Sequence, residues 1–88
     1  MKIVTEIVIG IEPEKATDLF SQARNKSILV SDMHLEEENS GICRYSLTVS
    51  CEKKKSLDEF LGALEVKDIC TIYSIRNASE ELITGGLL

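Results

Sequence analysis

Residues 27–51 read SILVSDMHLEEENSGICRYSLTVSC, and their pattern decides the fold. In the second half, apolar side chains occupy every other position, at Cys43, Tyr45, Leu47, Val49 and Cys51. In the first half, Leu29, Ser31, Met33 and Leu35 alternate with Val30, Asp32, His34 and Glu36. A period of two residues is typical of a strand with one buried face. The stretch therefore predicts two neighbouring strands.

The residues between these strands predict a tight hairpin. Asn39-Ser40-Gly41 suits a three-residue loop in which Gly41 takes the left-handed conformation. The resulting register places Leu35 opposite Tyr45, Met33 opposite Leu47, Leu29 opposite Cys51 and Glu36 across from Arg44. Apolar residues then pair on one face, and the charged pair has opposite signs.

On the N-terminal side, a strand and a helix precede the hairpin. Residues 3–11 alternate with Ile3, Thr5, Ile7, Ile9 and Ile11 on one face, which predicts a strand. Pro13 suits a first helical position. An apolar stripe at helical spacing follows, formed by Ala16, Leu19, Phe20 and Ala23, and predicts a helix over residues 13–25.

On the C-terminal side, a second helix and a fourth strand follow. Ser56-Leu57-Asp58-Glu59 reads as a capping box that starts the helix. Its core-facing stripe is Leu57, Phe60, Leu61 and Leu64. Residues 66–76 are rich in β-branched and aromatic types and predict a strand. Its facing stays open, because Ile69, Thr71, Tyr73 and Ile75 compete with Cys70 and Ile72 for the core side.

The order β, α, β, β, α, β predicts an α+β, ferredoxin-like fold. Right-handed crossovers place both helices on one face of a four-stranded antiparallel sheet with strand order 4-1-3-2. The helices are expected to cover Ile3, Ile7, Ile9, Met33, Leu35, Tyr45, Leu47 and Val49. With 88 residues, the chain suits one small domain over residues 1–77, followed by a C-terminal tail over residues 78–88.

Composition excludes several classes of function. The net charge of −5 and the pI near 4.8 disfavour nucleic acid as a partner. Lys53, Lys54 and Lys55 form a short run without interleaved aromatic residues, which favours a solvated loop. The longest apolar stretch, Ile7–Ile11, is far shorter than the ~20 residues that span a bilayer. Glu6 lies where a signal peptide needs apolar residues, so we expect a cytoplasmic location.

No catalytic, metal or cofactor site is predicted from the residue types. Cys43, Cys51 and Cys70 lack ligand-pair spacing and are interpreted as reduced, buried thiols. His34 has no motif that links it to a nucleophile, and an enzyme would have to use it or one of the thiols. Glu36, Glu37 and Glu38 are interpreted as a solvated hairpin end, because adjacent strand residues point to opposite faces.

In length and element order, residues 2–77 resemble the ACT-like regulatory domains. Three segments are similar to the C-terminal cytoplasmic domain of MgtC/SapB-type membrane proteins: residues 29–32, the turn at 39–41 and residues 44–51. The resemblance implies that the chain is a domain cut from a longer membrane protein. It also implies a non-catalytic regulatory or protein-interaction function, with a protein partner or the parent membrane domain as the binding partner.

The alternative is a small-molecule, amino-acid-sensing ACT domain. Such domains place an aspartate, a proline and a glycine at the first strand–helix turn, which here reads Gly10-Ile11-Glu12-Pro13-Glu14. The resemblance makes Gly10, Ile11, Glu12 and Glu14 the candidate ligand-binding residues. The two carboxylates at this turn would repel a ligand carboxylate, which favours protein docking.

Self-association is a further expectation from the open sheet. No helix is expected to cover Val4, Val8 and Val30, and the outer strands expose their backbone edges. We therefore expect a homodimer, formed through a sheet edge or through the open face.

Overall fold

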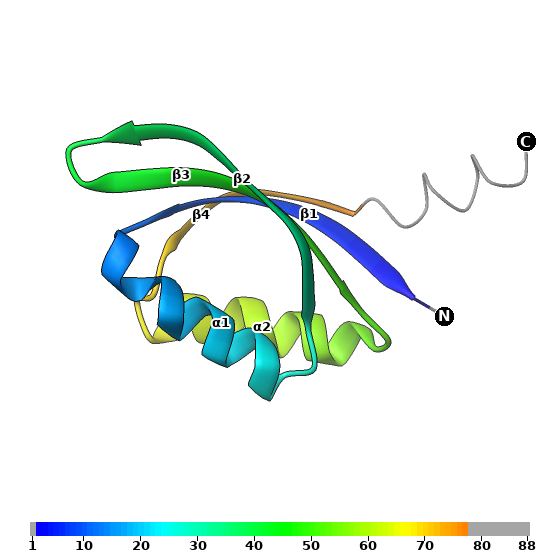
Figure 1. Ribbon diagram of the computed structural model, residues 1–88. Coiled ribbons are helices and arrows are strands. Elements are labelled where there is room, and N and C mark those ends of the chain that lie inside the picture. The colour runs from blue at the N-terminus through cyan, green and yellow to red at the C-terminus, as the bar shows by residue number, and fades with distance from the viewer. Residues whose placement is uncertain (1, 78–88) are drawn as a thin grey trace, which may run out of the picture.

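The computed structural model describes residues 2–77. Its elements are β1 (Ile3–Ile11), the 3₁₀ helix η1 (Pro13–Lys15), α1 (Ala16–Asn25), β2 (Leu29–Asn39), β3 (Ile42–Cys51), α2 (Lys54–Val66) and β4 (Thr71–Asn77). The strands form one antiparallel sheet in the order β2-β3-β1-β4, and both helices lie on the same side of it (Figure 1). The predicted ferredoxin-like fold and its strand order are confirmed. The predicted tail, residues 78–88, lies outside the described residues.

The core forms between the central strands and the two helices. Ile7 and Ile9 of β1 are fully buried, as are Leu19 of α1 and Phe60 and Leu64 of α2. The rest of the cluster comprises Ile11, Ala23, Ile28, Leu47, Val49, Cys51, Leu57 and Ile69. Alternation in β1 and β3 therefore selects the covered face, as the sequence predicts.

The hairpin is tighter than the predicted three-residue loop. Asn39 pairs with Ile42, so only Ser40 and Gly41 form the turn. Both have positive φ, +54° and +82°, as the two central residues of a type I′ turn require. The left-handed conformation expected at Gly41 is confirmed.

Two register shifts in β2 correct part of the predicted pairing. Leu35 pairs with Tyr45 and Met33 with Leu47, as predicted. Beyond the shift at Ser31, however, Leu29 pairs with Ser50 instead of Cys51. A bulge reverses the faces of the residues that lie beyond it, counted from the turn. Leu29 therefore no longer faces the core and is exposed. Val30 packs against the core, so its predicted place on the open face was wrong.

Two other residues expected in the core are largely exposed. Leu35 is 54% exposed and Phe20 is 43% exposed. Leu35 belongs to the outermost strand and Phe20 to the helix that packs near it, so neither has a neighbouring element on its outer side. Periodicity identifies the inward face of an element but does not reveal where the covering layer ends.

The second helix and the last strand begin at other residues than predicted. α2 starts at Lys54, with Lys53 as N-cap and no side-chain cap hydrogen bond, so the capping box at Ser56 was wrong. Lys54 and Lys55 therefore belong to a helical turn, not to a loop. β4 starts at Thr71, because α2 continues to Val66 and a turn follows it.

Both helices end in the same backbone motif. After α1, Ser27 takes the left-handed conformation (φ +59°), and the Ile28 N–H donates to the Ala23 carbonyl at 2.8 Å. After α2, Asp68 (φ +53°) and Ile69 repeat this arrangement, and both isoleucines are buried. This is the Schellman motif with its hydrophobic contact, formed here without glycine at the left-handed position.

Replacing Ser27 by glycine is expected to stabilise the fold. A left-handed conformation costs a residue with a Cβ roughly 1–2 kcal/mol. Glycine avoids this cost because it has no Cβ, but its larger loss of chain entropy offsets part of the gain. Ser27→Gly should therefore raise the free energy of unfolding in urea by about 0.5–1 kcal/mol. The control, Ser21→Gly inside α1, should lower it by about 0.5 kcal/mol. A loss of stability in Ser27→Gly would contradict the motif.

Candidate functional site

The sheet face opposite the helices carries few apolar side chains. By register, it presents Val4, Glu6, Val8 and Gly10 from β1, and Arg44, Ser46, Thr48 and Ser50 from β3. His34 of β2 pairs with Ser46, so it lies on this face and is exposed, as predicted. We call this surface the open face.

Tyr73 covers Gly10 at one end of the open face. A register shift in β4 pairs Ser74 with Val8 and Ile72 with Ile9, so Tyr73 is the extra residue of a bulge. A Cβ on Gly10 would lie 2.5 Å from the Tyr73 Oη. Glycine is therefore needed here because the ring packs directly on the β1 backbone.

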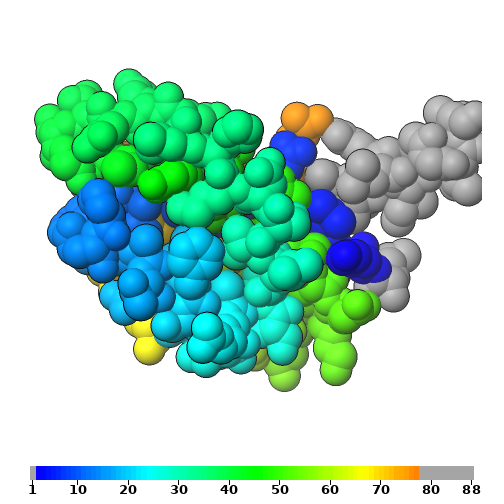
Figure 2. Space-filling model, viewed as in Figure 1, coloured from blue at the N-terminus to red at the C-terminus, as the bar shows by residue number. Residues whose placement is uncertain are grey.

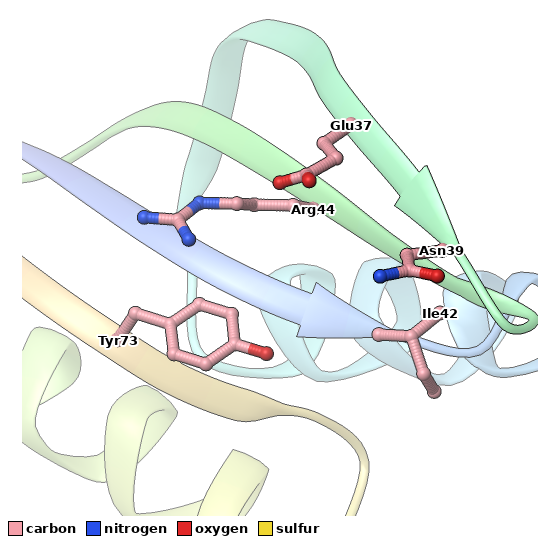
Figure 3. Close-up of a pocket in the computed structure, with 5 residues that line it drawn as sticks. All are labelled: Glu37, Asn39, Ile42, Arg44 and Tyr73. Carbon is pink, nitrogen blue, oxygen red and sulfur yellow. The ribbon is translucent and has the colours of Figure 1, made fainter.

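Arg44 also packs on this ring. Its guanidinium carbon lies 5.0 Å from the Tyr73 ring centroid, which is a cation–π distance. Its Nε lies 3.5 Å from Glu36 Oε1, although its strand partner is Glu37. These contacts border a hollow of about 230 Å³ lined by Glu37, Asn39, Ile42, Arg44 and Tyr73 (Figure 3).

A second hollow, of about 160 Å³, adjoins the first and shares Ile42 and Tyr73 with it. Its other lining residues are Gly10, Ile11, Glu12, Lys15, Asp68, Ile69, Cys70 and Thr71. The hairpin end and the residues around η1 thus form one continuous end of the molecule (Figure 2).

The structure brings three of the four predicted ligand-binding residues together. Gly10, Ile11 and Glu12 line the second hollow, whereas Glu14 is exposed and lies outside it. Gly10 and Ile11 are themselves buried, which leaves Glu12 as the most accessible of the three. Tyr73 and Arg44 were missed by the sequence reasoning. The only signal for them was Gly10 itself, since an isolated glycine in a strand marks close approach by another group.

Negative charge dominates the turn before α1. The pKa of the Glu14 carboxyl is lowered, chiefly by a hydrogen bond from its own backbone and next by a side-chain hydrogen bond with Glu12, so Glu14 is ionised at neutral pH. The Lys15 ammonium lies 3.8 Å from Glu12 and donates to the Asp68 carbonyl at 2.8 Å. The only cation at this turn is therefore held by protein groups.

The thiols are scattered through the fold. Cys43 and Cys51 are buried, as predicted, and Cys70 is half-buried at the second hollow. Burial raises the pKa of the Cys70 thiol to about 11, with a smaller contribution from the Glu65 carboxylate.

Within residues 2–77, no group of three or more His, Cys, Asp or Glu side chains is placed to hold a metal ion. None of the helices described here is long and apolar enough to cross a membrane.

Comparison by sequence gives no relatives. No protein-family model matches the chain, and no curated protein matches it significantly.

Comparison by structure finds proteins with the same fold, and these include the following three. A homoserine dehydrogenase from Thiobacillus denitrificans has a TM-score of 0.70 at 11% identity, over 88% of this chain and 17% of that chain. The de novo designed protein Foldit4 has a TM-score of 0.60 at 11% identity, over 88% of this chain and 96% of that chain. The C-terminal domain of the MgtC protein from Mycobacterium tuberculosis has a TM-score of 0.58 at 8% identity, over 84% of this chain and 83% of that domain.

These identities establish a shared fold and nothing finer. The chain spans only a small part of the dehydrogenase but most of the MgtC C-terminal domain. The ferredoxin-like architecture expected from the sequence is confirmed, and an MgtC C-terminal domain is among the structures that share it.

Proposed function

We propose that this chain is a non-catalytic regulatory domain that docks on a protein, as the cytoplasmic domain of an MgtC/SapB-like membrane protein. The observation that carries the proposal is the match with the MgtC C-terminal domain over most of both chains. The open face supports it, because no helix of residues 2–77 covers this side of the sheet. The partner would be the parent membrane domain or another protein.

Within residues 2–77, the thiols and His34 are not arranged as a nucleophile and its base. A cysteine nucleophile needs a lowered pKa, whereas the Cys70 pKa of about 11 keeps this thiol protonated at neutral pH. His34 lies on the open face in β2, while Cys43 and Cys51 are buried on the helix side of β3. A histidine on the opposite face cannot activate these thiols.

A small-molecule sensor, the second candidate, is favoured by one observation and opposed by three. Gly10, Ile11 and Glu12 do line one hollow, as an amino-acid-binding ACT domain would require. However, both hollows are smaller than the roughly 300–1,000 Å³ of most ligand pockets. Tyr73 also covers the Gly10 backbone, and ionised Glu14 would repel a ligand carboxylate.

We also propose that the domain forms a homodimer through the open face or a sheet edge. Val4 and Val8 are only half-buried on the open face, and β2 and β4 are the outer strands. β2 carries two bulges, which hinder edge-to-edge pairing. Among the possible surfaces, this favours the open face.

A thermal-shift screen separates docking from small-molecule sensing. Amino acids, nucleotides and divalent cations should leave the melting temperature unchanged. A true ligand at ten times its Kd would stabilise the fold by about 1.4 kcal/mol and raise the melting temperature by roughly 6–11 °C. A saturable rise that disappears in Glu12→Gln or Gly10→Ala would replace docking by sensing.

Sedimentation tests the homodimer. The chain should sediment as a dimer at high micromolar concentration, and Val8→Lys should convert it to a monomer, because a buried unpaired charge opposes association. The control Glu59→Lys lies on the exposed side of α2 and should remain dimeric. A wild-type chain that stays monomeric at this concentration would remove the claim.

A further inference from the structure

The two hollows around Tyr73 form a groove at the hairpin end of the open face. We call it the Tyr73 groove and define it by Ile42 and Tyr73, which both hollows share, with Glu37 in the first hollow and Asp68 in the second. Tyr73 is 50% exposed and Ile42 is 38% exposed. A half-exposed tyrosine packed against an arginine is typical of the residues that dominate binding at protein interfaces.

The cations beside the groove have protein partners, whereas two of its carboxylates have no ion pair among the described residues. Both cations have partners: Lys15 contacts Glu12 and the Asp68 carbonyl, and Arg44 contacts Glu36 and the Tyr73 ring. The carboxylates of Glu37 and Asp68 have no ion pair with any side chain of residues 2–77. Each hollow therefore contains one carboxylate that is free to pair with a cation from outside, and the Tyr73 ring lies between the hollows.

We propose that the Tyr73 groove binds a basic segment of a protein partner, with a lysine or arginine on each side of Tyr73. Glu37 and Asp68 would pair with these cations, while the ring and Ile42 contact their apolar stems. The proposal rests on the proposed function and names its partner chemistry. Membrane proteins concentrate lysine and arginine in their cytoplasmic loops, so a parent membrane domain would present such a segment to this domain.

Amide NMR on the full 88-residue chain, titrated with a synthetic peptide, tests the proposal. The probe is a ten-residue peptide of alternating lysine and serine, and its counterpart has glutamate in place of lysine. The lysine peptide should shift the amides of Ile42, Arg44, Asp68, Thr71 and Tyr73. The glutamate peptide should not, and higher salt should weaken the binding of the lysine peptide.

The Kd of the lysine peptide for three variants and a matched control tests which residues contribute to binding. Glu37→Gln and Asp68→Asn should each raise the Kd roughly two- to fivefold, the effect of one exposed ion pair. Asparagine also tolerates the left-handed backbone at Asp68. Tyr73→Leu should raise the Kd by a similar factor. Glu59→Gln on α2 removes the same charge away from the groove and should leave the Kd unchanged.

Three results would overturn the groove assignment. These are the absence of shifts with the lysine peptide, equal binding of the glutamate peptide, or equal weakening by Glu59→Gln, which would mean attraction by net charge alone. Any of them would leave the docking function standing with its surface elsewhere. A small-molecule ligand found by thermal shift would instead remove the docking function, whatever the peptide does.

Discussion

The alternation of β1 between two faces is the constraint on which the rest of the structure depends. β1 is hydrogen-bonded on both sides, to β3 and to β4, so each of its residues is committed to one face. Ile7, Ile9 and Ile11 are almost completely removed from water beneath the helices. Between them, Val8 and Gly10 are directed to the open face. One strand thus divides the described part of the molecule into a side covered by the helices and a side without helices.

This division explains why the candidate site lies where it does. The helices and their Schellman ends use the apolar side chains on one face, which leaves polar side chains and a few valines on the other. Gly10 is the one place where β1 has no side chain on the open face, and the bulge in β4 brings the Tyr73 ring onto it. Arg44 then packs on Tyr73 and is neutralised by Glu36. The hollows beside the ring follow from this local packing.

Local pattern was enough to predict the fold, because apolar residues alternate along β1 and β3 and recur every three or four residues along the two helices. The register in the middle of the hairpin followed from face matching at Leu35 and Met33. Nearer the turn, however, Arg44 pairs with Glu37 instead of the predicted Glu36. The pattern failed in β2 and left the facing of β4 open, because bulges change which face a residue occupies without any change in composition. Leu29, Val30 and Tyr73 are the residues affected. The predicted start of α2 was also wrong, because Ser56 has the right spacing for a cap but the helix begins earlier, at Lys54.

The candidate site was predictable only in part, for the same reason. Gly10, Ile11 and Glu12 are adjacent in the sequence, so a family resemblance was sufficient to group them. Asp68, Glu37 and Tyr73 come from three separate segments, and only the folded sheet brings them to one groove. Nothing in the spacing of these residues along the chain indicates that they share a surface.

The central claim is that stability is concentrated on one face of β1 while the other face is free for binding. Urea unfolding of two neighbouring variants tests it most directly. Ile9→Val removes one buried methylene and should lower the free energy of unfolding by about 0.5–1.5 kcal/mol. At a concentration where the chain is a monomer, Val8→Thr, one residue away on the open face, should change it by less than about 0.5 kcal/mol. Equal losses in the two variants, or a larger loss in Val8→Thr, would contradict the account.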